Sequence, residues 1–183
     1  ADISLAKGEG YKKIEQNNST RYAAGLSIKP LKNTIFRIYA DIYNDGEDMR
    51  DALPSNVTEG KYSDQKSIAL FAGYQNSVIS AGAEYNRVFN KGFIQDKDYY
   101  GYSLYASGKI ADKWRLYGRY DLMDSTTPEN FTSPWNSLDG QLMIIGVEYQ
   151  PVKQLKISPN FRNINPDRNK SEQYLFVSVE FNL

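Results

Sequence analysis

Hydrophobic and polar residues alternate along most of this chain. In TIFRIYADIY, residues 34–43, Phe36 and Ile38 would share one face of an extended chain and Arg37 and Asp41 the other. Side chains of a strand point to alternate faces, so a period of two predicts strands with one apolar and one polar face. We predict ten strands and little helix, because the pattern recurs in ISLAKGEGYK, RYAAGLSIKPL, KSIALFAGYQ, VISAGAEYN, YGYSLYASGKI, KWRLYGRYDL, QLMIIGVEYQ, LKISPNFR and YLFVSVEFNL.

The connections between these stretches alternate between short and long. A medium connection is expected near 13–20, and the others are expected near 30–33, 44–65, 75–77, 87–98, 111–113, 125–139, 151–154 and 163–173. Tilted strands of roughly 9 to 11 residues cross a hydrocarbon layer. Transmembrane barrels join such strands by short turns at one end and long loops at the other. The predicted fold class is therefore all-β: an antiparallel up-and-down transmembrane β-barrel of about ten strands, in one domain over residues 1–183.

Aromatic residues on the apolar faces sort by depth. Toward the long connections lie Tyr22, Tyr85, Tyr102, Tyr120 and Phe161, and toward the short ones lie Phe36, Tyr74, Trp114, Tyr149 and Phe181. Transmembrane barrels carry two such girdles, whereas a general preference of aromatic residues for strands predicts no sorting. The pattern predicts that lipid covers the apolar face.

The composition narrows the chemistry. Lys plus Arg and Asp plus Glu both number 22, so no net field favours nucleic acid. The chain has no Cys, which excludes thiolate metal sites, and no His, which excludes mechanisms that need an imidazole. No run of about 18 apolar residues predicts a transmembrane helix. The enzymatic barrels that we considered use His, so we predict no enzyme, no catalytic residue and no cofactor.

One acidic stretch could offer oxygen ligands to a cation. NDGEDMRD contains Asp45, Glu47, Asp48 and Asp51, but it lacks the full EF-hand spacing. We therefore assign no metal site.

The polar faces carry charged residues that we predict to face the lumen: Arg37, Asp41, Glu84, Lys109, Arg115, Arg119, Asp121, Glu148, Lys156 and Arg162. Such charges either pair in a packed interior or line a water-filled passage. Arg115 and Arg119 could together contact an anion. Alternatively, they pair with Asp121, Glu148 or Asp41. A ten-stranded barrel lies near the filled end of the size range, so any pore is expected to be small.

Several stretches resemble a known family. GEGYKK, AGLSIKPLKN, AGAEYN, YGRYDL, GVEYQPVKQLKISPNF and VEFNL resemble the C-terminal part of porin-like outer-membrane proteins of the Bacteroidota type, similar in style to phosphate-selective porins. The last strand also resembles the C-terminal signature of outer-membrane proteins, although it ends on Leu183 where that family usually has Phe. The resemblance implies an integral bacterial outer-membrane location. Relatives tend to be longer, so the chain is expected to be a whole barrel or the C-terminal portion of a larger one.

Three alternative functions are consistent with these sequence patterns. The first is a porin-like barrel for passive or weakly selective diffusion of small solutes. The second is a non-conducting structural, adhesive or partner-binding barrel that acts through its extracellular loops. The third is a soluble β-sandwich or carrier barrel whose apolar stripes point inward. Expected partners of an outer-membrane barrel are lipid, small solutes or ions, and either further copies of the chain or other envelope proteins; no nucleic acid is expected.

Overall fold

The protein is one antiparallel sheet of ten strands, paired in sequence order from the first strand to the last. The computed structural model describes residues 1–7, 20–44, 62–129, 131 and 133–182. Among these, no helix is both long and apolar enough to cross a membrane. The strands are β1 (Asp2–Lys7), β2 (Thr20–Ile28), β3 (Thr34–Tyr43), β4 (Gln65–Gln75), β5 (Ile79–Phe89), β6 (Tyr99–Ala111), β7 (Trp114–Ser125), β8 (Gly140–Val152), β9 (Leu155–Pro166) and β10 (Glu172–Phe181); a short 3-10 helix, η1 (Lys91–Phe93), precedes β6.

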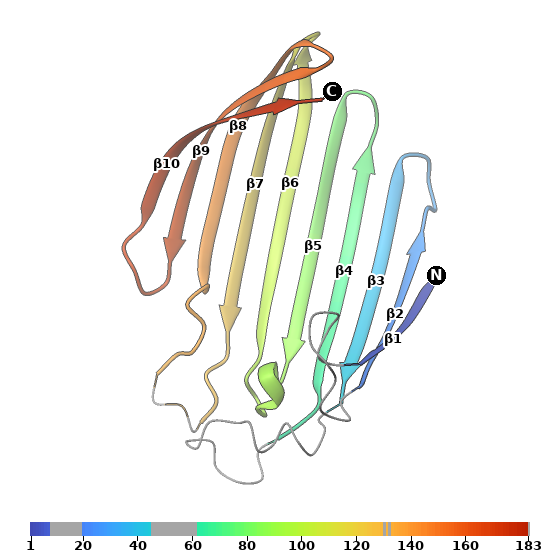
Figure 1. Cartoon of the computed structure of the whole chain (residues 1–183), viewed down its shortest axis with the longest axis vertical. Helices are drawn as coiled ribbons and strands as arrows, with labels where there is room; N and C mark the ends of the chain where they lie inside the picture. The colour runs from blue at the N-terminus through green and yellow to red at the C-terminus, as the bar shows by residue number, and fades with distance from the viewer. Residues whose placement is uncertain (8–19, 45–61, 130, 132, 183) are drawn as a thin grey trace.

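Each strand pairs with the next along the chain, which confirms the predicted up-and-down fold class. The turns after β2, β4, β6 and β8 lie at one end of the sheet, and the longer connections after β5 and β7 lie at the other (Figure 1). We call these the short-turn end and the long-loop end. At the long-loop end, β9 and β10 are longer than predicted. β9 continues to Pro166 and β10 begins at Glu172, so the connection between them is shorter than the expected 163–173 and that prediction was wrong in length. Gly140 pairs with Pro166 there, which keeps β9 in the sheet.

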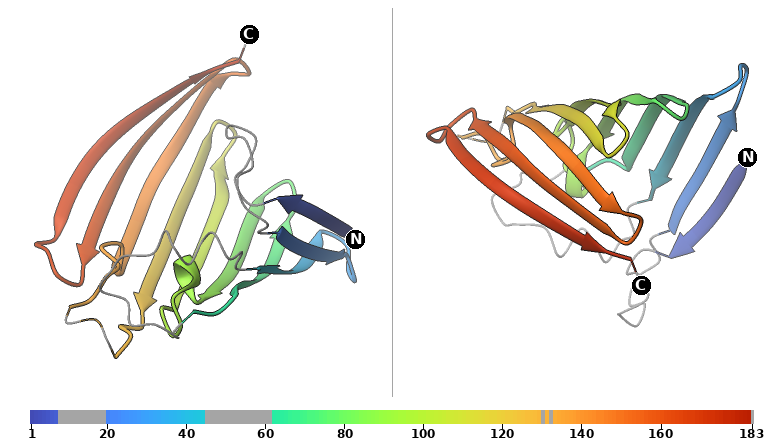
Figure 2. Two further views of the ribbon diagram at one scale, coloured as in Figure 1. Left: turned by 60° about the horizontal axis from the view of Figure 1, so that its bottom comes forward. Right: turned by 90° about the horizontal axis from the view of Figure 1, so that it is seen from above.

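The sheet is bent into an arch with β1 and β10 at its two margins (Figure 2). Within the described residues, no pairing joins β1 to β10. The outer backbone groups of these two strands therefore lack strand partners. This matters in an apolar solvent, because an unpaired backbone group there costs several kcal/mol.

The sheet exposes apolar side chains on its convex face and buries polar side chains on its concave face, which is the reverse of the arrangement in a soluble domain. On the convex face Leu26, Leu104 and Ile145 expose half of their surface or more. On the concave face Asp41 is 3% exposed and Asn160 is 6% exposed. Among the described residues, the buried apolar side chains are Ala23, Phe93 and Ile94. A soluble sandwich with inward apolar stripes would show the opposite arrangement.

Aromatic residues of the convex face lie at both ends of the sheet. Tyr85 and Tyr102 are directly paired near the long-loop end, with their ring centroids 4.9 Å apart. Trp114 and Tyr149 are directly paired near the short-turn end and stack at 4.4 Å. These pairs occupy the two depths that the sequence pattern predicts.

Tyrosine rings on the concave face lie over glycines of the neighbouring strand. Tyr105 is directly opposite Gly82, and Tyr117 is directly opposite Gly146. A Cβ atom at Gly146 would come within 2.5 Å of the Tyr117 ring, whose hydroxyl also bonds Ser158 Oγ at 2.8 Å. The missing side chain lets the ring lie flat on the sheet, which is a known way of pinning strand register.

An arginine on the convex face should be costly at mid-depth. Leu104 lies between Ala83 and Tyr120 on the neighbouring strands. Because we expect lipid to cover this face, Leu104→Arg should lower the free energy of unfolding in phospholipid vesicles by about 2–4 kcal/mol. Leu31→Arg is the matched control, since Leu31 is also exposed but lies in the turn after β2. Equal effects of the two variants on urea unfolding would contradict the assignment of the lipid-facing surface.

A methyl group at Gly146 should displace the Tyr117 ring. We expect Gly146→Ala to destabilise the sheet by about 1–3 kcal/mol, which is the usual range for overpacking. Gly108→Ala serves as the control, because a Cβ there would meet no atom within 4 Å. Unfolding of both variants in urea measures the difference, and an unchanged Gly146→Ala midpoint would show that the ring does not depend on the glycine.

Candidate functional site

The strand register determines which charged residues share a face. Directly paired residues of adjacent strands project to the same side of a sheet. Glu84 pairs with Ser103, which pairs with Asp121, and Arg115 pairs with Glu148. Followed across the sheet, the pairs put all ten charged candidates on the concave side: Arg37, Asp41, Glu84, Lys109, Arg115, Arg119, Asp121, Glu148, Lys156 and Arg162. Whether they line a water-filled lumen stays a prediction.

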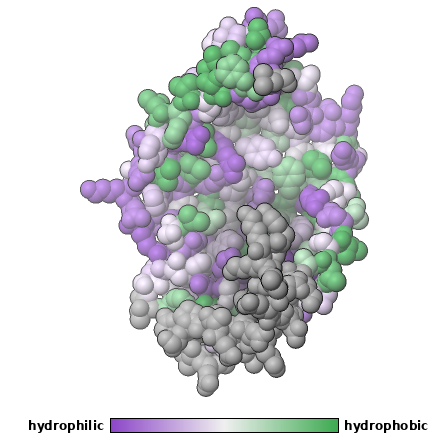
Figure 3. Space-filling model, viewed as in Figure 1, coloured by the Kyte–Doolittle hydropathy of each residue, from purple (hydrophilic) through white to green (hydrophobic). Residues whose placement is uncertain are grey.

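Figure 3 shows this side of the molecule, which is hollowed at its centre. Hydrophilic residues are spread over it, and hydrophobic ones gather toward the upper end and the right-hand margin. The hollow is therefore a surface with polar chemistry rather than an apolar carrier cavity.

Three of the candidates, Arg119, Asp121 and Asp41, take part in close ion pairs. Arg119 Nε donates to both carboxylate oxygens of Asp121, at 2.9 and 2.7 Å. Arg21 Nη2 donates to Asp41 at 2.8 Å, and the Asp41 side chain is fully covered. These pairs support the interpretation that some lumen charges are structural, because a buried carboxylate needs a partner.

Arg37 pairs with an aspartate that the sequence pattern did not single out. Its Nη2 lies 3.0 Å from each carboxylate oxygen of Asp2, and its Nη1 donates to Ser27 Oγ at 3.0 Å. Asp2 belongs to β1, the strand with the weakest alternation. The available signal was that Asp2 alternates with the apolar Ile3, which places its side chain on the polar face of the strand.

Lysine pairs occur near the short-turn end. Lys109 Nζ lies 3.2 Å from Asp112, and Lys156 Nζ lies 3.6 Å from Glu180. The partner carboxylates are mostly exposed, so each pair contributes little to stability.

Four candidates form no ion pair within the described part of the chain: Arg115, Glu148, Glu84 and Arg162. Arg115 donates to Ser107 Oγ at 3.0 Å but makes no ion pair with Glu148, although the two are directly opposite. Glu84 accepts a hydrogen bond from the Asn86 amide. Arg162 Nε donates to Asn160 at 2.9 Å, and its guanidinium lies 4.4 Å from the Phe176 ring centroid. Arg115 and Arg119, which were predicted to contact an anion together, are therefore in different environments. Asp121 holds Arg119, whereas Arg115 forms no ion pair with a carboxylate of the described residues.

Three cavities follow one another along the concave face. The cavity at the long-loop end, of about 430 Å³, is lined by Glu84, Ser103, Arg119 and Asp121 among others. A second cavity, of about 340 Å³, has both Arg119 and Tyr105 in its wall. Tyr105 also lines a third cavity, of about 750 Å³, at the short-turn end. Arg119 and Tyr105 therefore lie at the boundaries that a solute moving along this face would pass.

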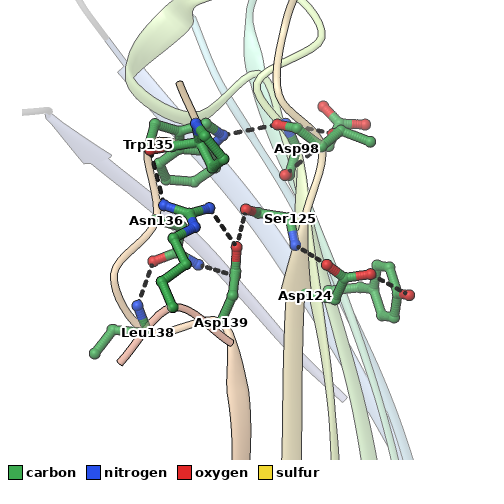
Figure 4. Close-up of polar contacts among 11 residues, drawn as sticks. Asp98, Asp124, Ser125, Trp135, Asn136, Leu138 and Asp139 are labelled. Atoms are coloured by element: carbon green, nitrogen blue, oxygen red, sulfur yellow. Dashed lines mark hydrogen bonds and ion pairs between the residues drawn. The ribbon is translucent and has the colours of Figure 1, made fainter. Parts of the chain in front are cut away.

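The connections at the long-loop end are tied together around a buried aspartate (Figure 4). Asp139, 5% exposed, accepts hydrogen bonds from Ser125 Oγ and from the Asn136 amide, the latter at 2.7 Å. Arg168, from the connection before β10, lies 3.7 Å from Asp139 and donates to the Pro134 carbonyl at 2.8 Å. This network holds the wall of the 430 Å³ cavity in place. Sequence reasoning missed it, since loop residues follow no periodic pattern.

Lys97 lies against aromatic residues of the same end. Its Nζ is 4.7 Å from the Trp135 ring centroid and 5.5 Å from that of Phe131. Burial, together with the neighbouring Lys91, lowers the pKa of Lys97. The contacts join the connection before β6 to the connection after β7.

Phe93 forms a small apolar cluster at the same end. Its ring is 2% exposed and packs edge-on against Tyr43, with the centroids 4.9 Å apart, beside buried Ile94. Its φ of 65° is left-handed, a conformation that costs a non-glycine residue about 1–3 kcal/mol. Packing of the ring offsets this strain, and the contact with Tyr43 joins the connection before β6 to the end of β3.

The acidic stretch over 45–51 lies outside the described residues. In the part of the chain that the structure describes, no three acidic side chains are grouped so as to hold a metal ion.

An up-and-down antiparallel sheet with its apolar face exposed and its polar face hollowed is a porin-like β-sheet architecture. No protein-family model matches the chain, and no curated protein matches it significantly. Among solved structures, it is similar to one described as the KdgM porin in complex with disordered oligogalacturonate. The two are 12% identical with a TM-score of 0.38, over 91% of this chain and 93% of that one. A likeness this distant transfers no residue role and no ligand.

Proposed function

We propose that the chain forms a porin-like β-barrel of a bacterial outer membrane, through which small solutes diffuse passively or with weak selectivity. The observation that carries the proposal is the division of the faces: exposed apolar side chains cover the convex face, and charged residues share the concave face. Lipid would cover the first, and water and solutes would meet the second.

The proposal requires partners for the free edges of β1 and β10. In hydrocarbon, every backbone donor and acceptor must be bonded within protein. The two edges would be satisfied by pairing with each other or with further strands, which would turn the arch into a closed barrel.

The charge pattern supports weak rather than strong selectivity. Arg119 and Arg37 are each held by a carboxylate, so their charges are largely compensated. Arg115 has no such partner among the described residues, and it is the best candidate for an anion preference like that of the phosphate-selective porins that the sequence resembles. Asp121 is held in an ion pair with Arg119 and is not free to act as an acid or base, so we propose no enzymatic activity.

Single-channel conductance tests the passage. The detergent-purified protein, its intact mass confirmed, should give reproducible current steps in a planar lipid bilayer. Folded protein that remains silent would contradict the proposed passage and direct attention to the loops and their partners.

Removing the Arg115 charge, which has no ion pair among the described residues, should change ion choice. We expect Arg115→Gln to shift the reversal potential in a salt gradient toward cation preference, because a fixed positive charge repels cations from a narrow passage. Lys32→Gln, in the exposed turn after β2, removes the same charge outside the sheet and should change little. Identical shifts for both variants would show that Arg115 does not face the ion path.

The apolar cluster at the long-loop end favours a second candidate function, a barrel without a useful pore. Phe93 packs against Tyr43 of the concave face, and the neighbouring connections are linked by hydrogen bonds. Such a barrel would act through the surface of its loops.

The size of the Phe93 ring separates the two candidates. Phe93→Ala should enlarge the current steps, or reveal them in a silent protein, because it removes the ring from the mouth of the hollow. Leu138→Ala is the control, since Leu138 is a large apolar residue at the same end but is 71% exposed. Unchanged steps in Phe93→Ala would mean that the passage is limited elsewhere.

A further inference from the structure

The 430 Å³ cavity at the long-loop end combines opposite charges in a way that suggests a particular ligand. It lies between β5 and β9, and the segment 137–139 forms part of its wall. The network around Asp139 holds that segment in place through hydrogen bonds from Ser125 and Asn136.

Arg119 is oriented to present its terminal amino groups. Both carboxylate oxygens of Asp121 accept a hydrogen bond from Arg119 Nε, and the Arg119 side chain is 53% exposed. Within the described part of the chain, neither Nη of Arg119 has a hydrogen-bond partner. A guanidinium held through Nε leaves its fork free, and such a fork matches a carboxylate in two parallel hydrogen bonds.

Glu84 supplies the opposite charge in the same cavity. Glu84, Ser103 and Asp121 stand in one row across β5, β6 and β7. Asp121 forms an ion pair with Arg119, whereas the hydrogen bond that Glu84 makes among the described residues comes from the Asn86 amide. Glu84 can therefore accept hydrogen bonds from an ammonium group.

Ser103 lies between Glu84 and Asp121 in this row, and its hydroxyl is unsatisfied. Its Oγ is buried and lacks a hydrogen-bond partner among the described residues. Such an atom is unfavourable, because it has lost its hydrogen bonds to water without gaining one in the protein. A polar ligand that displaces the surrounding side chains would offer this hydroxyl a partner.

We propose that this cavity binds a small zwitterionic solute, such as an amino acid or short peptide, with its carboxylate on the Arg119 fork and its ammonium on Glu84. A simple anion would face the uncompensated Glu84, and a simple cation would face the free fork of Arg119. A zwitterion satisfies both groups at once. The inference rests on the proposed function, because the cavity is taken to lie on the solute path.

Four small molecules of similar size separate the possibilities. Glycylglycine is a zwitterion, N-acetylglycine an anion, glycinamide a cation and N-acetylglycinamide neutral. In calorimetric titrations of the folded protein in detergent micelles, glycylglycine should bind more tightly than the other three. Equal or tighter binding of a singly charged or neutral probe, or no binding of glycylglycine, would overturn the proposal.

Matched variants locate the binding. Arg119→Gln and Glu84→Gln should each weaken glycylglycine binding about tenfold, since each removes a charge-assisted hydrogen bond. Arg162→Gln is the control for the arginine, because Arg162 lies in the same row across Ile144 but outside the cavity. Glu148→Gln is the control for the glutamate, on the same face nearer the short-turn end. Equal losses in test and control variants would overturn the assignment of the site.

Calorimetry keeps this inference distinct from the proposed passage. A protein that binds glycylglycine but carries no current retains the site and loses the passage. A protein that conducts but does not bind glycylglycine retains the passage and loses the site. Circular dichroism of each variant checks that a lost signal does not come from a lost fold.

Discussion

The structure depends on one requirement, that neighbouring strands satisfy each other's backbone hydrogen bonds in a single continuous ladder. The ladder runs from β1 to β10 with bulges in β6–β7 and β8–β9. Because its register is nearly unbroken, a side chain assigned to one face on β2 has its counterparts on that face through β10. The apolar exterior and the charged hollow are both consequences of this register. The free edges of β1 and β10 are where the requirement is not met by the described residues.

The wall of the hollow is held by contacts between side chains of the concave face. Tyr117 lies flat on the glycine opposite it, and Arg119 is held through Nε by Asp121. Such contacts stiffen the wall without closing it, because each ring or guanidinium lies along the sheet rather than across the hollow. The arrangement leaves cavities in series, with Arg119 and Tyr105 at their boundaries. Selectivity along this face would therefore depend on few side chains.

The alternation of side chains was enough to predict the strands, their order and their two faces. Leu104 and Arg119 lie on the faces that their positions in the period of two require. The ends of strands were harder to predict, because polar residues such as Asn163 and Gln173 remain paired beyond the apolar stretch. Backbone hydrogen bonds do not depend on side-chain polarity, so a hydropathy pattern cannot mark where the ladder stops.

By itself, then, the sequence determined the all-β fold, the apolar outer face and the set of charged residues on the other face, since all three follow from a local period of two. Only the tertiary structure decided which charges meet. Arg37 contacts Asp2 from 35 positions earlier, and Asp139 receives Arg168 and Ser125 from separate connections. These contacts depend on sheet curvature and on loop conformation, which no local pattern encodes. The division of the arginines into paired and unpaired groups, on which the proposed selectivity rests, was decided there.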